Sequence, residues 1–149
     1  MANSYFIKLR IEPAMRRALA ELFGTNFQER EMPIRWHGEG SGSFRFDAVS
    51  DDGKIIAALS AARNLKTGQR NKLMRDATFM WLVPNVQRRI LAVVEVGVAD
   101  ALRAELCCGR LPPETEIHIV DLASEIRQEL ERFRVIALKE VGADLVADV

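Results

Sequence analysis

The sequence predicts a mixed α/β fold in which helices cover both faces of a central mixed sheet. Two observations lead to this fold class. An amphipathic helix is followed by three strands, two of them flanking the turn Asp51-Asp52-Gly53. From residue 67 onward, helical and strand patterns alternate. A three-stranded meander followed by alternating helices and strands produces a sheet with antiparallel and parallel pairs, covered on both faces.

The first half of the chain begins with a helix and a short strand. Pro13 suits the first turn of a helix and Gly24 its end, and apolar residues recur between them at helical spacing. Residues 5–9 fit either a short strand or a helical lead-in. Residues 34–37 alternate apolar and polar, as in a strand, and residues 38–43 form a glycine-rich connection.

Strands over residues 43–50 and 54–62 then form a hairpin, because Gly53 accepts the positive φ that a tight turn requires. In the second half, each element has its own signature of periodicity and of terminating glycine or proline. The predicted elements are a helix over 67–82, an apolar central strand over 89–95, a helix over 98–107, a strand over 116–120 and a helix over 123–142.

Composition favours one domain, residues 1–149, with its core at about 10–122. The chain has 149 residues, of which 48% are hydrophobic, and its 21 basic and 21 acidic residues balance. The zero net charge gives no global electrostatic case for nucleic acid. The adjacent Cys107 and Cys108 exclude a disulfide framework, and His37 and His118 make no zinc signature. Without a signal-peptide layout or a bilayer-length apolar run, a cytoplasmic protein is expected.

Asp47 is the most informative residue of the hairpin. Strand alternation assigns its neighbours to faces: Arg45, Asp47 and Val49 to one face of the first strand, and Phe44, Phe46 and Ala48 to the other. On the second strand, the matching face carries Ile56, Ala58, Ser60 and Ala62.

This order of elements, with an Asp on the hairpin, resembles the restriction-endonuclease-like fold of nucleases marked by an Asp and an (Asp/Glu)-x-Lys triplet. The resemblance covers about residues 10–122. It places Asp47 at the first acidic position, where it would help to hold Mg²⁺ if the protein is active. The triplet falls on Ala58-Leu59-Ser60 or Ser60-Ala61-Ala62, and neither contains a carboxylate or a lysine.

The resemblance therefore implies a degenerate site that needs no cofactor. For an active, rebuilt site the candidate catalytic residues are Asp47, Ser60 and Lys66, and Glu21 is a candidate second acid. Other side chains of the following helix that could reach the site are Gln69, Arg70 and Lys72. An alternative role for Asp47 is to bond the hairpin backbone or to pair with Arg45.

Three functions stay open: a silent binding module, an active Mg²⁺-dependent nuclease and a structural homo-oligomer. The candidate contacts to DNA or RNA, or to an acidic protein face, form a basic stretch that also fits a solvated helix face: Arg63, Lys66, Arg70, Lys72 and Arg75. The candidate oligomer interface lies near the C-terminus, at Leu138, Val141, Leu145 and Val146.

Overall fold

A computed structural model describes residues 5–36 and 40–141. Its centre is a five-stranded sheet with the strand order β1-β2-β3-β4-β5. The strands are β1 (Phe27–Arg35), β2 (Ser41–Ser50), β3 (Ile55–Ser60), β4 (Arg88–Val93) and β5 (Thr115–Ile119). The helices of the described residues are η1 (Ile7–Ile11), α2 (Glu12–Phe23), α3 (Thr67–Trp81), α4 (Val96–Cys107) and α5 (Ser124–Val141).

The sheet is mixed, as the sequence predicts. β1, β2 and β3 pair antiparallel, whereas β3, β4 and β5 pair parallel. The parallel strands are joined by α3 and α4, the long crossover connections that parallel pairing requires. The predicted mixed α/β fold with an antiparallel meander is therefore confirmed.

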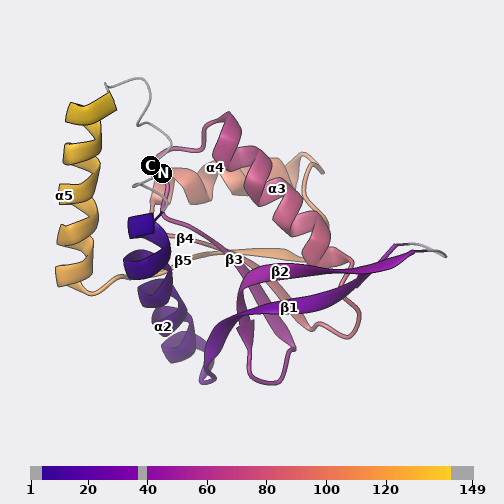
Figure 1. The fold of residues 1–149 in the computed structure, drawn as a ribbon. Coiled ribbons are helices and arrows are strands. Elements are labelled where there is room, and N and C mark those ends of the chain that lie inside the picture. The colour runs from indigo at the N-terminus through magenta and orange to yellow at the C-terminus, as the bar shows by residue number, and fades with distance from the viewer. Residues whose placement is uncertain (1–4, 37–39, 142–149) are drawn as a thin grey trace.

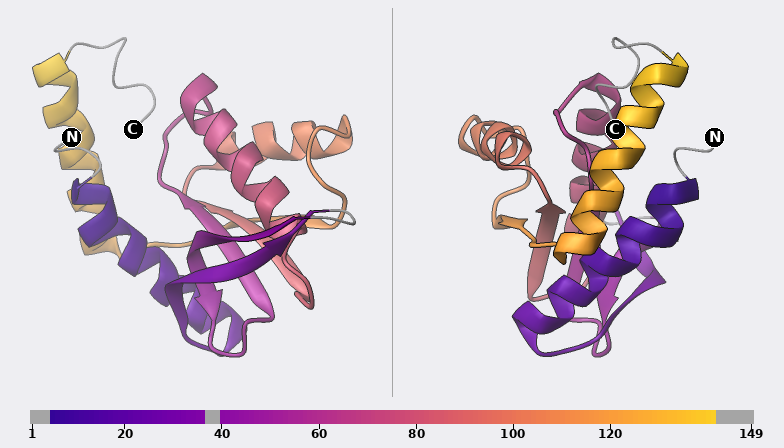
Figure 2. Two further views of the ribbon diagram at one scale, coloured as in Figure 1. Left: turned by 45° about the vertical axis from the view of Figure 1, so that its right-hand side comes forward. Right: turned by 90° about the vertical axis from the view of Figure 1, so that its left-hand side faces the viewer.

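Helices cover both faces of the sheet (Figures 1 and 2). α2 and α5 pack on one face, around Met15, Leu19 and Leu130. α3 and α4 pack on the other, around Leu73, Met80 and Leu102. β4 is an inner strand between β3 and β5, and its last four residues are buried. Both crossover helices lie on one face because β3, β4 and β5 follow one another in a single direction across the sheet.

The N-terminal segment is helical, which settles the alternative that the sequence leaves open. η1 is a π-helical turn that continues directly into α2. Pro13 lies at the start of α2, and Gly24 ends it in the left-handed conformation, with φ of 70°. The helix begins at Glu12, one residue before Pro13, and this residue proves important for the site below.

Two predictions need correction, the extent of the first two strands and the burial of Trp81. β1 is nine residues long, so it begins well before the short strand expected at residues 34–37. β2 begins at Ser41, within the connection expected at residues 38–43. β1 is an edge strand with many half-exposed polar residues, and such a strand lacks the apolar alternation by which strands are recognised. Trp81 recurs at helical spacing with Leu73, Ala77 and Met80, which predicts it on the buried face of α3. It is instead exposed, because it lies in the last position of that helix.

The remaining predictions concern the cysteines, membrane-spanning helices and the oligomer interface. Cys107 and Cys108 are exposed free thiols at the end of α4. Within residues 5–36 and 40–141, none of the helices has the length and apolar character needed to cross a bilayer. Leu145 and Val146 of the predicted oligomer interface lie outside the described residues.

Candidate functional site

Asp47 lies at a β-bulge. The pairing of β1 with β2 shifts by one residue between Gln28 and Arg30, so that Asp47 and Ala48 together stand opposite Glu29. A bulge of this kind inserts one extra residue in one strand, increases the local twist and redirects a side chain. The redirected side chain here is the carboxylate of Asp47.

The bulge overturns the predicted assignment of faces on β2. Phe46 and Val49 both pack against the α3/α4 side of the sheet, whereas Ala48 packs against the α2/α5 side. Strict alternation would place Phe46 with Ala48 and Asp47 with Val49. It fails because the extra residue inverts the order of faces beyond it.

On β3 the predicted alternation holds. Ile56 and Ala58 face α3 and α4, while Ala57 and Leu59 face α2 and α5.

The carboxylate of Asp47 bridges β2 and β3. The described pairs of these strands are Ala48 with Ala57 and Val49 with Ile56. Beyond these pairs, Oδ2 of Asp47 accepts a hydrogen bond of 2.9 Å from the backbone N–H of Leu59. The side chain thus serves β3 in place of a main-chain acceptor, as one of the predicted alternatives for Asp47 proposes. Arg45 pairs instead with Glu29.

Lys72 approaches Asp47 from α3. Its Nζ lies 3.3 Å from Asp47 Oδ2, 3.3 Å from the carbonyl oxygen of Leu59 and 3.0 Å from Asp76 Oδ2. Burial opposes the charge of the ammonium, but the carboxylates of Asp47 and Asp76 outweigh this and raise the pKa of Lys72. An ammonium group has three N–H donors, and here each has an oxygen within reach. Lys72 is therefore held as a cation among oxygens from β2, β3 and α3.

Glu12 approaches the same place from α2. Its side chain is only 18% exposed, and its Oε1 has no hydrogen-bond partner among the described residues. Arg16, one turn later, lies 3.8 Å from that oxygen and donates a 3.0 Å hydrogen bond to the carbonyl of Asp47. Burial and, second, the negative charge of Asp47 raise the pKa of Glu12. Sequence reasoning missed this residue because the helix was expected to begin at Pro13.

The other predicted catalytic residues lie elsewhere. Ser60 is buried and donates to Gln69 Oε1 at 3.2 Å, while its Oγ accepts from the backbone N–H of Ala62. Lys66 precedes α3, is exposed, and makes no side-chain hydrogen bond within residues 5–36 and 40–141. Glu21 is exposed near the far end of α2, in a separate hollow between α2 and the end of β5. The structure thus joins Asp47 directly to Lys72 and links it to Glu12 through Arg16, whereas Lys66 and Glu21 lie elsewhere.

The predicted basic stretch is largely paired with carboxylates. The pairs are Arg63 with Glu131, Arg70 with Glu105, Lys72 with Asp47 and Asp76, and Arg75 with Asp76. Arg75 nevertheless keeps 57% of its side chain exposed. The stretch is therefore a charge-balanced surface rather than a continuous positive one.

The donor set suits a divalent cation poorly. Within the described part of the chain, no group of three or more His, Cys, Asp or Glu side chains is placed to hold a metal ion. Glu12, Asp47 and the Leu59 carbonyl are hard oxygen donors of the kind that Mg²⁺ prefers. Two of these donors already bind the ammonium of Lys72. The residues as arranged accommodate a lysine in the position that a metal would need.

Comparisons of the chain with protein-family models, with curated proteins and with solved structures found no match.

Proposed function

We propose that this protein is a catalytically silent relative of metal-dependent nucleases that binds nucleic acid without cleaving it. The observation that supports the loss of catalysis is the position of Lys72, whose Nζ lies 3.3 Å from both Asp47 Oδ2 and the Leu59 carbonyl. A divalent cation would need the same oxygens and would have to displace the ammonium. Without a metal, the site has no group that lowers the pKa of an attacking water.

The nucleic-acid part of the proposal is supported by the cations near this site that remain accessible. Lys66 is exposed at the start of α3, and the side chain of Arg75 is 57% exposed. Arg63 pairs with Glu131 across an exposed surface, and such a pair contributes only about 0–1 kcal/mol, so a phosphate can replace the carboxylate.

Binding is tested by fluorescence anisotropy with labelled single-stranded and double-stranded DNA and RNA at two salt concentrations. We expect saturable binding that weakens as salt rises, because phosphate contacts release counterions. Binding that is absent, or that ignores salt, would remove nucleic acid as the partner. A Lys66→Gln/Arg75→Gln double variant should bind more weakly than wild type.

The second candidate is an active metal-dependent nuclease with a rebuilt site. It is favoured by Glu12, a half-buried carboxylate whose pKa the charge of Asp47 helps to raise and whose buried Oε1 lacks a hydrogen-bond partner among the described residues. In such a site Glu12 and Asp47 would hold the cation, and Lys72 would have to move aside.

Supercoiled plasmid with Mg²⁺ or Mn²⁺ separates the two candidates. Binding without cleavage supports the silent module. Cleavage that disappears in both Asp47→Ala and Glu12→Gln would establish the rebuilt nuclease instead. Equal cleavage by wild type and both variants would identify a contaminating enzyme and would exclude an active site at Asp47 and Glu12.

A further inference from the structure

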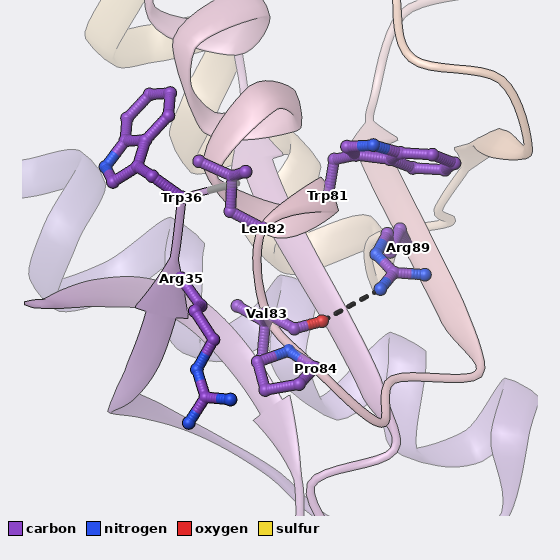
Figure 3. Close-up of a pocket in the computed structure, with 7 residues that line it drawn as sticks. All are labelled: Arg35, Trp36, Trp81, Leu82, Val83, Pro84 and Arg89. Carbon is purple, nitrogen blue, oxygen red and sulfur yellow. Dashed lines mark hydrogen bonds between the residues drawn. The ribbon is translucent and has the colours of Figure 1, made fainter. Parts of the chain in front are cut away.

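A second candidate site lies at the C-terminal end of α3, away from Lys72. A pocket of about 380 Å³ opens where β1 and α3 end and β4 begins (Figure 3). Its lining consists of Arg35, Trp36, Trp81, Leu82, Val83, Pro84 and Arg89. Lys72 and Trp81 are nine residues apart on one helix, which corresponds to about 14 Å along its axis. The volume falls within the range of small-molecule sites.

Two indole rings flank this pocket, on opposite sides of Leu82 in Figure 3. Trp36 is 50% exposed and meets the ring of Phe79 edge-to-face, with the ring centroids 6.2 Å apart. Trp81 is 40% exposed and stacks against the guanidinium of Arg89, 5.4 Å from its ring centroid. Each indole is thus held by one neighbour while much of its surface remains open to a ligand. A pair of exposed aromatic rings around one hollow marks a binding surface rather than chance exposure.

The lining is positively charged. Arg35 and Arg89 are its ionisable members, and it contains no acidic side chain. Arg89 donates to the carbonyls of Met80 and Val83 at 2.7 and 2.9 Å, and it has no carboxylate partner among the described residues. Burial lowers the pKa of Arg89, but a guanidinium stays protonated in proteins. The pocket therefore attracts an anion.

Arg35 supplies the accessible charge. Its backbone N–H donates to the Leu82 carbonyl at 3.0 Å, which ties the end of β1 to the end of α3. Its side chain makes no ion pair or hydrogen bond within residues 5–36 and 40–141, and it extends away from the indole of Trp36 (Figure 3). Arg89 is held against Trp81, whereas the accessible cation Arg35 lies apart from the indole of Trp36. The pocket thus offers flat rings and a separate cation, which suits a ligand with a flat ring and an anionic group.

We propose that this pocket binds single-stranded nucleic acid, with bases against the indoles of Trp36 and Trp81 and a neighbouring phosphate on Arg35. Stacked bases and a nearby cation are the usual means of holding single strands without sequence readout. A duplex hides the faces of its bases within the stack, and a peptide made only of Asp and Glu offers no flat ring for the indoles. The choice of nucleic acid as the ligand rests on the proposed function, whereas the location of the site rests on this pocket alone.

Intrinsic fluorescence tests the location directly, because Trp36 and Trp81 are the chain's two tryptophans. The probe is an oligothymidylate of roughly ten nucleotides, a length within the usual range of single-strand sites. We expect saturable quenching of the tryptophan emission, weaker at about 200 mM than at about 50 mM salt. Polyglutamate at the same concentration should leave the emission unchanged, and equal quenching by polyglutamate would overturn the choice of ligand.

Variants then test the individual contacts by anisotropy of the labelled oligonucleotide. Trp36→Ala should weaken binding by about fivefold or more, as expected when one stacked base is lost. Trp81→Phe keeps a smaller ring beside Arg89 and should weaken binding less. Arg35→Gln should lower the slope of log affinity against log salt by about 0.7, the contribution of one phosphate contact on a single strand.

The matched control is Arg17→Gln, which removes the same charge from an exposed position of α2, on the opposite face of the sheet. Unchanged thermal midpoints show that the variants fold. Oligonucleotide binding without quenching, or binding weakened equally by Arg17→Gln and Arg35→Gln, would overturn this pocket while leaving the proposed function intact. Absence of any binding at either salt concentration would overturn both.

Discussion

Replacing Lys72 by methionine should destabilise the protein measurably. The substitution keeps the apolar stem but removes the ammonium that lies within 3.3 Å of Asp47 Oδ2 and 3.0 Å of Asp76 Oδ2. Removing one partner of a fully buried pair costs about 3–5 kcal/mol, and losing an exposed pair about 0–1 kcal/mol. The side chain of Lys72 is 34% exposed and that of Asp76 is 6% exposed, so an intermediate loss of ~2 kcal/mol is expected.

Equilibrium unfolding in urea, monitored by circular dichroism, measures this loss as a lower midpoint with an unchanged slope. The corresponding decrease in thermal midpoint is roughly 4–8 °C for a domain of this size. Lys66→Met is the matched control, because it removes the same charge from an exposed position just before α3.

If Lys72 occupies the position of a cation, millimolar Mn²⁺ should restore part of the stability of Lys72→Met and leave the control unchanged. Equal midpoints for Lys72→Met and Lys66→Met would refute the inference that this ammonium neutralises buried carboxylates.

Three further changes test other parts of the charge network. Burial and the charge of Asp47 raise the pKa of Glu12, so wild type should lose stability as pH rises from 4.5 through that pKa. Glu12→Gln should abolish this loss. Parallel profiles of stability against pH for the variant and wild type would contradict it. The Arg88 hydrogen bond lowers the pKa of Glu116 from 4.5 to about 2. The ionised Glu116 should therefore stabilise the fold at neutral pH, by at most about 1 kcal/mol after solvent screening, and this stabilisation should disappear as pH falls from 4.5 to about 2. Glu116→Gln melting curves should accordingly differ from wild type at pH 7 but converge with it near pH 2. Buried Arg134 donates a hydrogen bond of 2.6 Å to the Ala61 carbonyl. Arg134→Met should lower the free energy of unfolding in urea by about 3 kcal/mol. A loss below about 1 kcal/mol would be inconsistent with a stabilising role for this guanidinium.

Local patterns were sufficient to predict most of the fold. Pro13 and Gly24 mark the ends of a helix through their own backbone preferences, and Gly53 marks the hairpin in the same way. The apolar run that becomes β4 predicts a strand buried on both faces, which is where the sheet places it. Only the end of β1 was predicted, as part of the short strand at residues 34–37. The rest of β1 escaped recognition because its side chains are mostly polar and half-exposed, so that its pairing with β2 leaves little trace in its sequence.

The candidate site could be predicted only in part. Asp47 was identifiable from its place on the hairpin, and Lys72 was one of several side chains that a following helix could bring to it. The choice of Lys72 over Lys66 depends on how α3 is rotated against the sheet, which is determined by packing of its apolar face. Glu12 reaches the site because α2 crosses the opposite face of the sheet, and helical periodicity alone does not orient that crossing.

The sequence by itself determined the fold class, most of the element order and the importance of Asp47, because these follow from periodicity and turn chemistry within short segments. Only the tertiary structure decided what Asp47 contacts. The bulge that redirects its carboxylate arises where the register of β2 shifts against β1, about twenty residues earlier in the chain. A register shift between two strands is a property of their pairing, so neither strand's own sequence pattern contains it.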